Sequence, residues 1–246
     1  LLLSIGVIFA GVSLPAPAQA SSLKVNPPHL EIGTFFSGHQ ISLTGSIPTN
    51  RNVVIEIKGP EEKSVFNMKG RVGPFWMNRG KLELEKAPFL YLLLLPEGKE
   101  WSAPFSSFGV GIEQLKQTII IRPHDISLDV VFPRFVKLKR SEHLYGELKG
   151  AIRYSPSTER TKLFEGKFSF PSSTLPGEYQ IVTKVLNDGK IEETSVHGFT
   201  VKEVGFIKTV HELAYHRGLL YGISCVLIAL FVGAVIGLFF KGGGAH

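Results

Sequence analysis

Eight histidines are the side chains in this sequence best suited to metal binding or to proton transfer near neutral pH. They are His29, His39, His124, His143, His197, His211, His216 and His246. No two of them have a spacing that would make both of them ligands on one strand or helix, and His211 and His216, five residues apart, face different sides of a helix. We therefore expect no metal ion and no cofactor, with a metal site assembled from distant segments as the alternative.

Paired carboxylates are the second group that could do chemistry, because two of them can divide acid and base roles. Glu61-Glu62 and Glu192-Glu193 lie beside turn residues, and Asp125 and Asp129 would share one face of a strand. Solvated loop, hairpin and strand-face charges explain these pairs. The sequence also contains no Gly-x-Ser-x-Gly, no phosphate-binding or dinucleotide-binding glycine loop, no Cys-x-x-Cys and no His-Glu-x-x-His. We therefore predict a protein that is not an enzyme and has no catalytic residues.

The stretch Arg71-Val-Gly-Pro-Phe-Trp-Met-Asn-Arg79 combines aromatic, amide and basic side chains. Trp76, Asn78 and Arg79 are the candidate recognition surface, since tryptophan and arginine supply much of the energy of many interfaces. The alternative, which we favour, is a core tryptophan beside a turn at Asn78-Arg79-Gly80.

The net charge and the cysteine content limit the classes of protein to which this chain can belong. The 246 residues carry a net charge of +6, with dispersed basic residues. The densest basic run, Lys137, Lys139 and Arg140, has no RNA-binding motif beside it, so we expect no nucleic acid. A solvated strand face, or a surface close to lipid headgroups, explains this run better. Cys225 is the only cysteine, which excludes an intrachain disulfide and fits a bacterial envelope protein.

Two apolar segments determine the placement of the chain. Residues 1–20 end in Ala18-Gln19-Ala20 and predict a secretory signal peptide, with an uncleaved anchor as the alternative. Residues 218–240 contain no charged residue and predict a transmembrane helix, because about 20 apolar residues span a bilayer. We expect a single-pass protein of the bacterial inner membrane, with a periplasmic ectodomain and a cytoplasmic tail over 241–246.

Three glycines of the predicted transmembrane helix could form a packing surface. Gly233 and Gly237 are four residues apart, and Gly222 lies about three turns earlier on a similar face. Small residues let another helix approach closely, so the stripe Gly222, Gly233 and Gly237 is the candidate helix-packing site. The alternative is the general abundance of glycine in membrane helices.

Alternating apolar residues predict a mainly β ectodomain made of two immunoglobulin-like or Greek-key β-sandwich modules, residues 21–121 and 122–203. The predicted strands are 30–36, 41–47, 53–58, 72–77, 81–84, 89–95, 126–132, 144–154, 164–170, 181–185, 191–193 and 197–201. A Pro-Gly-x-Tyr step at Tyr179 predicts a tyrosine corner, and Asn187-Asp188-Gly189 a hairpin turn. Helices are predicted over 108–117 and over a stalk, 204–217.

Several segments together resemble a family of uncharacterised bacterial envelope proteins, first described in alphaproteobacteria, with a single C-terminal transmembrane helix. The matching segments are 36–45, 53–60, 75–78 with 87–91, 175–179 with 187–189, 204–206 and 216–222. The resemblance covers nearly the whole mature chain, but Arg217 stands where the family usually has proline. It implies association with polytopic anion exporters of the sulfite-exporter type and assigns no catalytic residues.

The sequence therefore predicts a non-enzymatic, membrane-anchored periplasmic accessory subunit that contacts the lipid bilayer and a polytopic membrane protein. An independent envelope module for ligand binding or adhesion is the alternative hypothesis, since sandwich domains often have such roles. An enzyme with a site assembled in an ectodomain pocket is the third.

Overall fold

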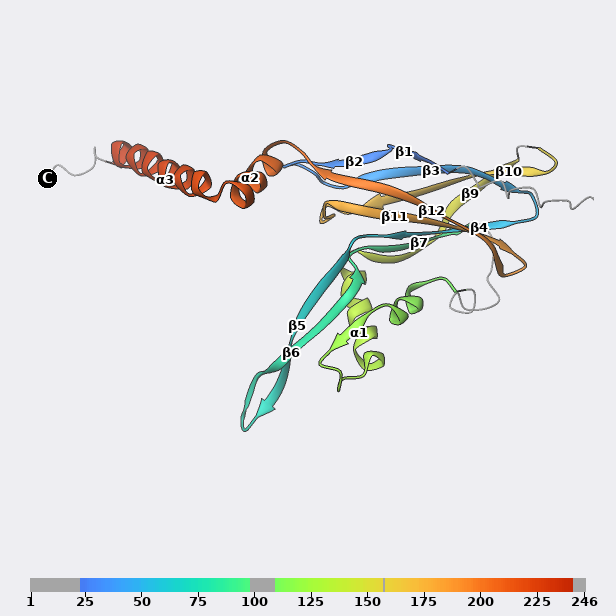
Figure 1. Cartoon of the computed structure of the whole chain (residues 1–246), viewed down its shortest axis with the longest axis horizontal. Helices are drawn as coiled ribbons and strands as arrows, with labels where there is room; N and C mark the ends of the chain where they lie inside the picture. The colour runs from blue at the N-terminus through green and yellow to red at the C-terminus, as the bar shows by residue number, and fades with distance from the viewer. Residues whose placement is uncertain (1–22, 98–108, 157, 241–246) are drawn as a thin grey trace, which may run out of the picture.

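A computed structural model of the protein describes residues 23–97, 109–156 and 158–240. The chain is mainly β, as predicted, and a single long helix extends from the β-rich part at the C-terminal end (Figure 1). The predicted signal peptide and the predicted tail lie outside the described residues.

A nine-stranded sheet forms the body of the protein, in the order β1-β3-β10-β9-β7-β4-β11-β12-β2. Its strands are β1 (Lys24–Asn26), β2 (His29–Ile32), β3 (His39–Pro48), β4 (Asn52–Lys58), β7 (Tyr91–Pro96), β9 (Tyr145–Pro156), β10 (Thr161–Phe170), β11 (Gly177–Asn187) and β12 (Lys190–Glu203). All neighbours are antiparallel except β7 with β9 and β12 with β2. Because the two outermost strands, β1 and β2, are consecutive in the chain, the sheet is nearly closed.

The strands on either side of the predicted module boundary at residue 121 are interleaved in this sheet. β3 pairs with β10, β4 with β11, β7 with β9, and β2 with β12, so the strands of the two segments alternate across the sheet. The division into sandwich modules 21–121 and 122–203 is therefore wrong, because the main sheet is built from strands of both segments. The backbone hydrogen bonds and buried faces of each half are completed by the other half.

The core of the sheet is apolar and rich in aromatic rings. Phe170 on β10 stacks on Phe199 at 5.6 Å between ring centroids and meets Tyr179 edge-on at 5.1 Å. The Tyr179 hydroxyl donates a hydrogen bond to the Leu175 carbonyl at 2.8 Å, which is the predicted tyrosine-corner contact. Asp188 and Gly189 both have positive φ, as a two-residue type I′ hairpin turn requires, and this turn joins β11 to β12 as predicted.

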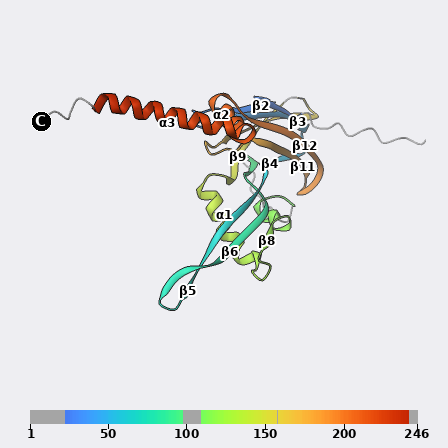
Figure 2. The same ribbon diagram turned by 60° about the vertical axis from the view of Figure 1, so that its left-hand side comes forward.

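A long hairpin with a short third strand forms a second sheet that projects from the body (Figure 2). Its strands are β5 (Glu61–Val72), β6 (Phe75–Pro88) and β8 (Ile120–Arg122). The hairpin turns at Gly73-Pro74, where Gly73 has a φ of 60°, and not at residues 78–80 as predicted. The reason is that glycine at the first central position satisfies a two-residue turn, while residues 78–80 are accommodated as an irregularity beside Met68.

A helix, α1 (Leu128–Ser141), packs beside this hairpin and occupies the position of the strand predicted over 126–132. The buried side chains of α1 are Phe132, Phe135 and Lys139, at helical spacing. The apolar alternation that predicted the strand is interrupted after Phe132, so it covers only the first turns of the helix. The basic run at 137–140 is accordingly helical, and Lys139 within it is buried.

The remaining helices follow the predictions more closely. A 3-10 helix, η2 (Ile112–Gln117), occupies the end of the segment predicted as helical over 108–117. Gly109 and Gly111 have φ values of 64° and 102°, which prevent a regular helix from starting earlier. α2 (Gly205–His216) is the predicted stalk, and α3 (Gly218–Phe240) has the bounds predicted for the transmembrane helix. α3 is the one helix of the described part that is long and apolar enough to cross a bilayer.

Candidate functional site

Glu56 is a carboxylate in the middle of the body and has only 1 % of its surface exposed. It lies on β4, which is flanked by β7 and β11. The alternation of Val53, Ile55 and Ile57 with Glu56 and Lys58 in the sequence is the pattern of a strand buried on one face only. Both faces are buried from Val53 to Ile57, because the segment around Gly111 covers the face that carries Glu56.

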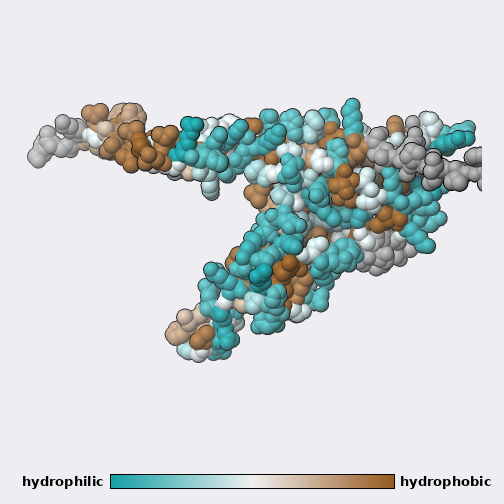
Figure 3. Space-filling view, in the orientation of Figure 1, coloured by the Kyte–Doolittle hydropathy of each residue, from teal (hydrophilic) through white to brown (hydrophobic). Residues whose placement is uncertain are grey.

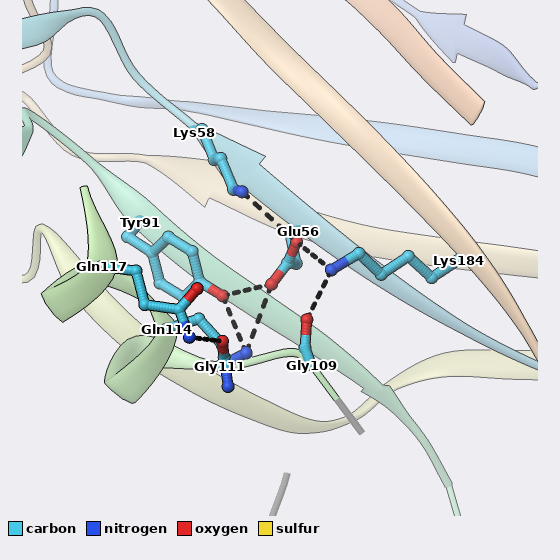
Figure 4. Close-up of polar contacts among 8 residues, drawn as sticks. All are labelled: Glu56, Lys58, Tyr91, Gly109, Gly111, Gln114, Gln117 and Lys184. Atoms are coloured by element: carbon cyan, nitrogen blue, oxygen red, sulfur yellow. Dashed lines mark hydrogen bonds and ion pairs between the residues drawn. The ribbon is translucent and has the colours of Figure 1, made fainter. Parts of the chain in front are cut away.

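Neighbouring groups of the protein hold one oxygen of Glu56 in place (Figure 4). The Tyr91 hydroxyl, on β7, donates to Glu56 Oε1 at 2.5 Å. The Gly111 amide lies 3.2 Å from the same Oε1 and 3.1 Å from the Tyr91 hydroxyl oxygen, so its hydrogen is directed between the two acceptors. These contacts join β4 and β7 to the segment that leads into η2.

Two lysines neutralise the other oxygen, Oε2. Lys184 Nζ, from β11, lies 3.0 Å from Oε2, and Lys58 Nζ, from β4 itself, lies 3.5 Å from it. Oε2 accepts no well-directed hydrogen bond, so charge attraction holds it in place. Lys184 Nζ also donates to the Gly109 carbonyl at 2.9 Å, and so ties the same covering segment to the sheet.

Opposing effects determine the charge of Glu56. Burial alone would raise the pKa of its carboxyl, but the Tyr91 hydrogen bond and the charges of Lys58 and Lys184 outweigh burial and lower that pKa. The carboxylate is therefore ionised at neutral pH. Burial, together with the neighbouring Glu56 charge, raises the pKa of the Tyr91 hydroxyl, so Tyr91 remains a hydrogen-bond donor.

A pocket of about 400 Å³ opens beside this cluster. Its lining mixes cations, carboxylates and amides: Glu56, Lys58, Gly59, Pro60, Glu61, Lys86, Pro88, Tyr91, Gly111, Gln114, Leu115, Thr118, Glu178 and Gln180. The size and the mixed charges suit a small polar molecule. The Glu56 carboxylate is already bound by Tyr91 and Lys184. Its role is therefore to hold the wall of the pocket in place.

Histidines and carboxylates do not gather into a metal site in the described part of the chain, where no three His, Cys, Asp or Glu side chains lie close enough to hold an ion. Each carboxylate pair noted in the sequence has one member that forms an ion pair with a basic side chain. Glu62 pairs with Lys139, Glu192 with Arg51, and Asp129 with Lys116.

A protein family described as "Putative transmembrane protein (Alph_Pro_TM)" matches residues 22–242. The chain belongs to this family. The match covers the whole described structure from β1 to α3, so the sheet, the hairpin and the apolar helix are all parts of the family's common sequence. None of the curated proteins shows significant similarity to the chain.

The predicted packing glycines all lie in α3. Space for a side chain is open at Gly222, Gly233 and Gly237: apart from the adjacent residues and the backbone of α3 itself, no atom of the described protein lies within 4 Å of the position that a Cβ would take. No contact within the described chain therefore uses this stripe.

The predicted recognition residues lie on β6, near the end of the hairpin. Trp76 has 74 % of its surface exposed, so the favoured interpretation as a core tryptophan is wrong. Asn78 and Arg79 are exposed as well, and the aliphatic part of Arg79 lies over Gly70 of β5. The hairpin brings Trp76 opposite Arg71 in the ladder.

Two buried charged groups were missed from the sequence. Glu56 is a carboxylate inside the apolar run 53–57, and that placement was the available signal for a buried charge. The sequence gave little indication that Lys139 is buried, because its neighbours Lys137 and Arg140 are also basic. It pairs with Glu62, and its ammonium lies 5.2 Å and 5.7 Å from the ring centroids of Phe89 and Phe135.

Proposed function

We propose that the protein is a non-enzymatic accessory subunit, anchored by α3, whose ectodomain associates with a polytopic membrane protein. We place it in the inner membrane of a bacterium, with the sheet and hairpin in the periplasm and the C-terminus in the cytoplasm. The family resemblance makes an anion exporter of the sulfite type the leading candidate partner.

The observation that carries this proposal is the open glycine stripe on α3. Eleven residues separate Gly222 from Gly233, which is about three helical turns, so all three glycines lie on nearly one line along the helix. Close approach of a second helix at such a stripe gains van der Waals contact that lipid tails supply less well. An anchor without a partner needs only apolar length.

The ectodomain supports a binding role through its architecture. Within the nine-stranded sheet, the runs β1-β3-β10-β9 and β4-β11-β12, joined through β7, have the same strand order as the two sheets of an immunoglobulin-like sandwich, and the Tyr179 contact resembles the tyrosine corner of that fold. Folds of this kind carry partner-binding loops and hairpins on a rigid core. The engaged oxygens of Glu56 support the non-enzymatic part of the proposal, because a carboxylate held by Tyr91 and Lys184 is not free for proton transfer.

Co-purification tests this proposal. The tagged full chain would be extracted from its native membrane in mild detergent, and polytopic proteins retained with it would be identified and quantified. We expect the double variant Gly233→Leu with Gly237→Leu to retain at least about tenfold less partner, which corresponds to about 1.4 kcal/mol of lost helix contact.

The control places two leucines on the opposite face of α3, with Val235→Leu and Phe231→Leu, and should retain the partner. Recovery of the wild-type chain without any polytopic protein would contradict the proposal. Equal retention by the glycine variant and the control would contradict the assignment of the stripe.

A second candidate function is an independent ligand-binding module, and the pocket beside Glu56 is the observation that favours it. This function predicts that small polar molecules raise the thermal stability of the purified chain, and that Lys86→Ala at the pocket lining abolishes the effect.

A further inference from the structure

The tip of the β5–β6 hairpin exposes a cluster of large apolar side chains. Val72, Phe75, Trp76 and Met77 form this hairpin tip, and Phe75 and Trp76 have 67 % and 74 % of their surfaces exposed. Figure 3 shows hydrophobic residues gathered at the far end of the hairpin, separated from the body by a more hydrophilic stretch. No contact within the described chain covers the tip.

The two faces of the tip differ in chemistry. Val72 is the ladder partner of Phe75, and Met77 lies two residues further on, so these three apolar side chains share one face. Trp76 lies on the other face opposite Arg71, whose guanidinium donates to the Gly73 carbonyl at 3.2 Å. An indole beside a guanidinium is an amphipathic pair, apolar on its ring and polar at its edge.

Charge along the hairpin is segregated by position. From Phe66 to Leu82, the outer half of the hairpin carries four basic residues and no carboxylate. The basic residues are Lys69, Arg71, Arg79 and Lys81. The carboxylates of the hairpin all lie at its base: Glu61, Glu62, Glu83 and Glu85. Of these, Glu62 pairs with Lys139, and Glu83 and Glu85 pair with Lys63. The outer half is therefore uniformly cationic around an apolar end.

The direction of the hairpin relates the tip to the membrane. In both views the hairpin leaves the body at a separate point and at a steep angle to α3, inclined toward the side from which α3 extends (Figures 1 and 2). A bilayer that encloses α3 therefore lies on the side toward which the hairpin is inclined. Its interface attracts tryptophan, and its anionic headgroups attract lysine and arginine.

We infer that the hairpin tip is a second membrane contact, in which Phe75, Trp76 and Met77 enter the interface of an anionic bilayer while the four basic residues bind lipid phosphates. The tip and α3 then hold the body at two separated points, which restricts how the ectodomain can rotate above the membrane. This contact requires lipid alone and does not depend on the partner protein proposed above.

Depth-dependent fluorescence quenching tests this inference on the full chain. The variant Trp101→Phe leaves Trp76 as the sole tryptophan, and α3 anchors the purified protein in vesicles of phosphatidylcholine and phosphatidylglycerol. We expect Trp76 emission to be quenched strongly by lipids brominated near the headgroup and weakly by lipids brominated at the chain ends. In vesicles of phosphatidylcholine alone, quenching should fall, because each basic residue near an anionic surface contributes about a fivefold gain in local binding.

Two variants separate the tip from the rest of the body. A tryptophan introduced by Leu163→Trp, with Trp76→Phe and Trp101→Phe, reports from an exposed apolar position on β10, outside the hairpin, and should not be quenched. A second variant replaces the four basic residues of the hairpin by glutamine: Lys69, Arg71, Arg79 and Lys81. In this variant, Trp76 should be quenched equally in anionic and in neutral vesicles. Its thermal unfolding should match that of the parent protein, because all four side chains are exposed.

Absence of quenching at Trp76 in anionic vesicles would overturn the inference. That result is also expected if the tip binds a partner protein and not lipid. Equal quenching at the Leu163→Trp position would overturn it as well, because the body would then lie on the bilayer without preference for the tip.

Discussion

One buried side chain, Glu56, links the main sheet to the irregular segment that covers it. Glu56 is charged and nearly fully buried, a combination that costs free energy unless opposite charges and hydrogen bonds surround it. Tyr91, Lys184 and the Gly111 amide supply them, and two of the three contacts reach the segment over Gly109 and Gly111. Removing one partner therefore affects both the strand and the segment that covers it.

Substitution of Glu56 by glutamine should destabilise the protein in a pH-dependent way. We expect the free energy of unfolding at neutral pH to fall by about 2–4 kcal/mol, since Lys184 loses its buried partner. The pKa of the carboxyl is lowered by folding, so the stabilisation is fully present above its unfolded value of 4.5 and is lost as the pH falls through the lower folded value. The difference between wild type and variant, measured by unfolding in neutral detergent, should shrink in acid.

The matched control for this variant is Glu165→Gln, which removes an exposed carboxylate paired with Lys167 on β10. Its effect should remain within about 0.5 kcal/mol at every pH, as exposed pairs contribute little. A difference for Glu56→Gln that stays constant from neutral pH down to pH 3 would contradict the proposed charge state.

At the scale of elements, α1 is attached to the hairpin base by a small number of contacts. Phe135 packs edge-on against Phe66 of β5 at 6.3 Å and against Tyr145 of β9 at 5.7 Å. Lys139 pairs with Glu62 of β5 beside the ring of Phe89. The helix thus joins the projecting hairpin to the main sheet and sets the angle at which the hairpin leaves the body.

The variant Lys139→Ala should loosen α1 without unfolding the main sheet. It removes the Glu62 pair, two cation–π contacts and the apolar stem of the lysine, which together contribute about 2–3 kcal/mol. Hydrogen exchange of the α1 amides should accelerate accordingly, while amides of β10 and β11 keep their protection. Lys137→Ala, two residues away on the exposed face of the same helix, is the control and should leave exchange unchanged.

Local sequence patterns correctly predicted the elements in which one pattern of burial or exposure extends along most of the element. β3 and β10 alternate over their full length, the Asp188-Gly189 turn needs two positive φ values, and α3 is uniformly apolar. The pattern around Phe132 was misleading because its alternating residues enter a helix whose buried face continues at Phe135 and Lys139. The Glu56 contacts could not be predicted, since Tyr91, Gly111 and Lys184 are distant in the sequence and meet only through the strand order.

At the scale of the whole molecule, one short segment closes the sheet and also fixes the anchor. β1 pairs with β3 at one edge of the sheet, and β2 pairs with β12 at the other. Beyond β12, the Val204 amide donates to the Ile32 carbonyl at 2.9 Å, immediately before α2 begins. The point at which the chain leaves the body for the membrane is therefore held by β2, and the angle between the body and α3 depends on that strand staying paired.

Leu30→Ala should release this edge before it affects the rest of the sheet. Leu30 on β2 is buried, and its truncation costs about 2–4 kcal/mol through lost burial and an unfilled cavity. We expect hydrogen exchange to rise first at residues 200–204, the partners of β2, and mobility of a spin label at α2 to rise with it. Glu31→Ala, whose side chain faces solvent from the same strand, should change neither. If the label at α2 remains as ordered in Leu30→Ala as in the control, then α2 is positioned by contacts other than β2, and the edge strand serves only to close the sheet.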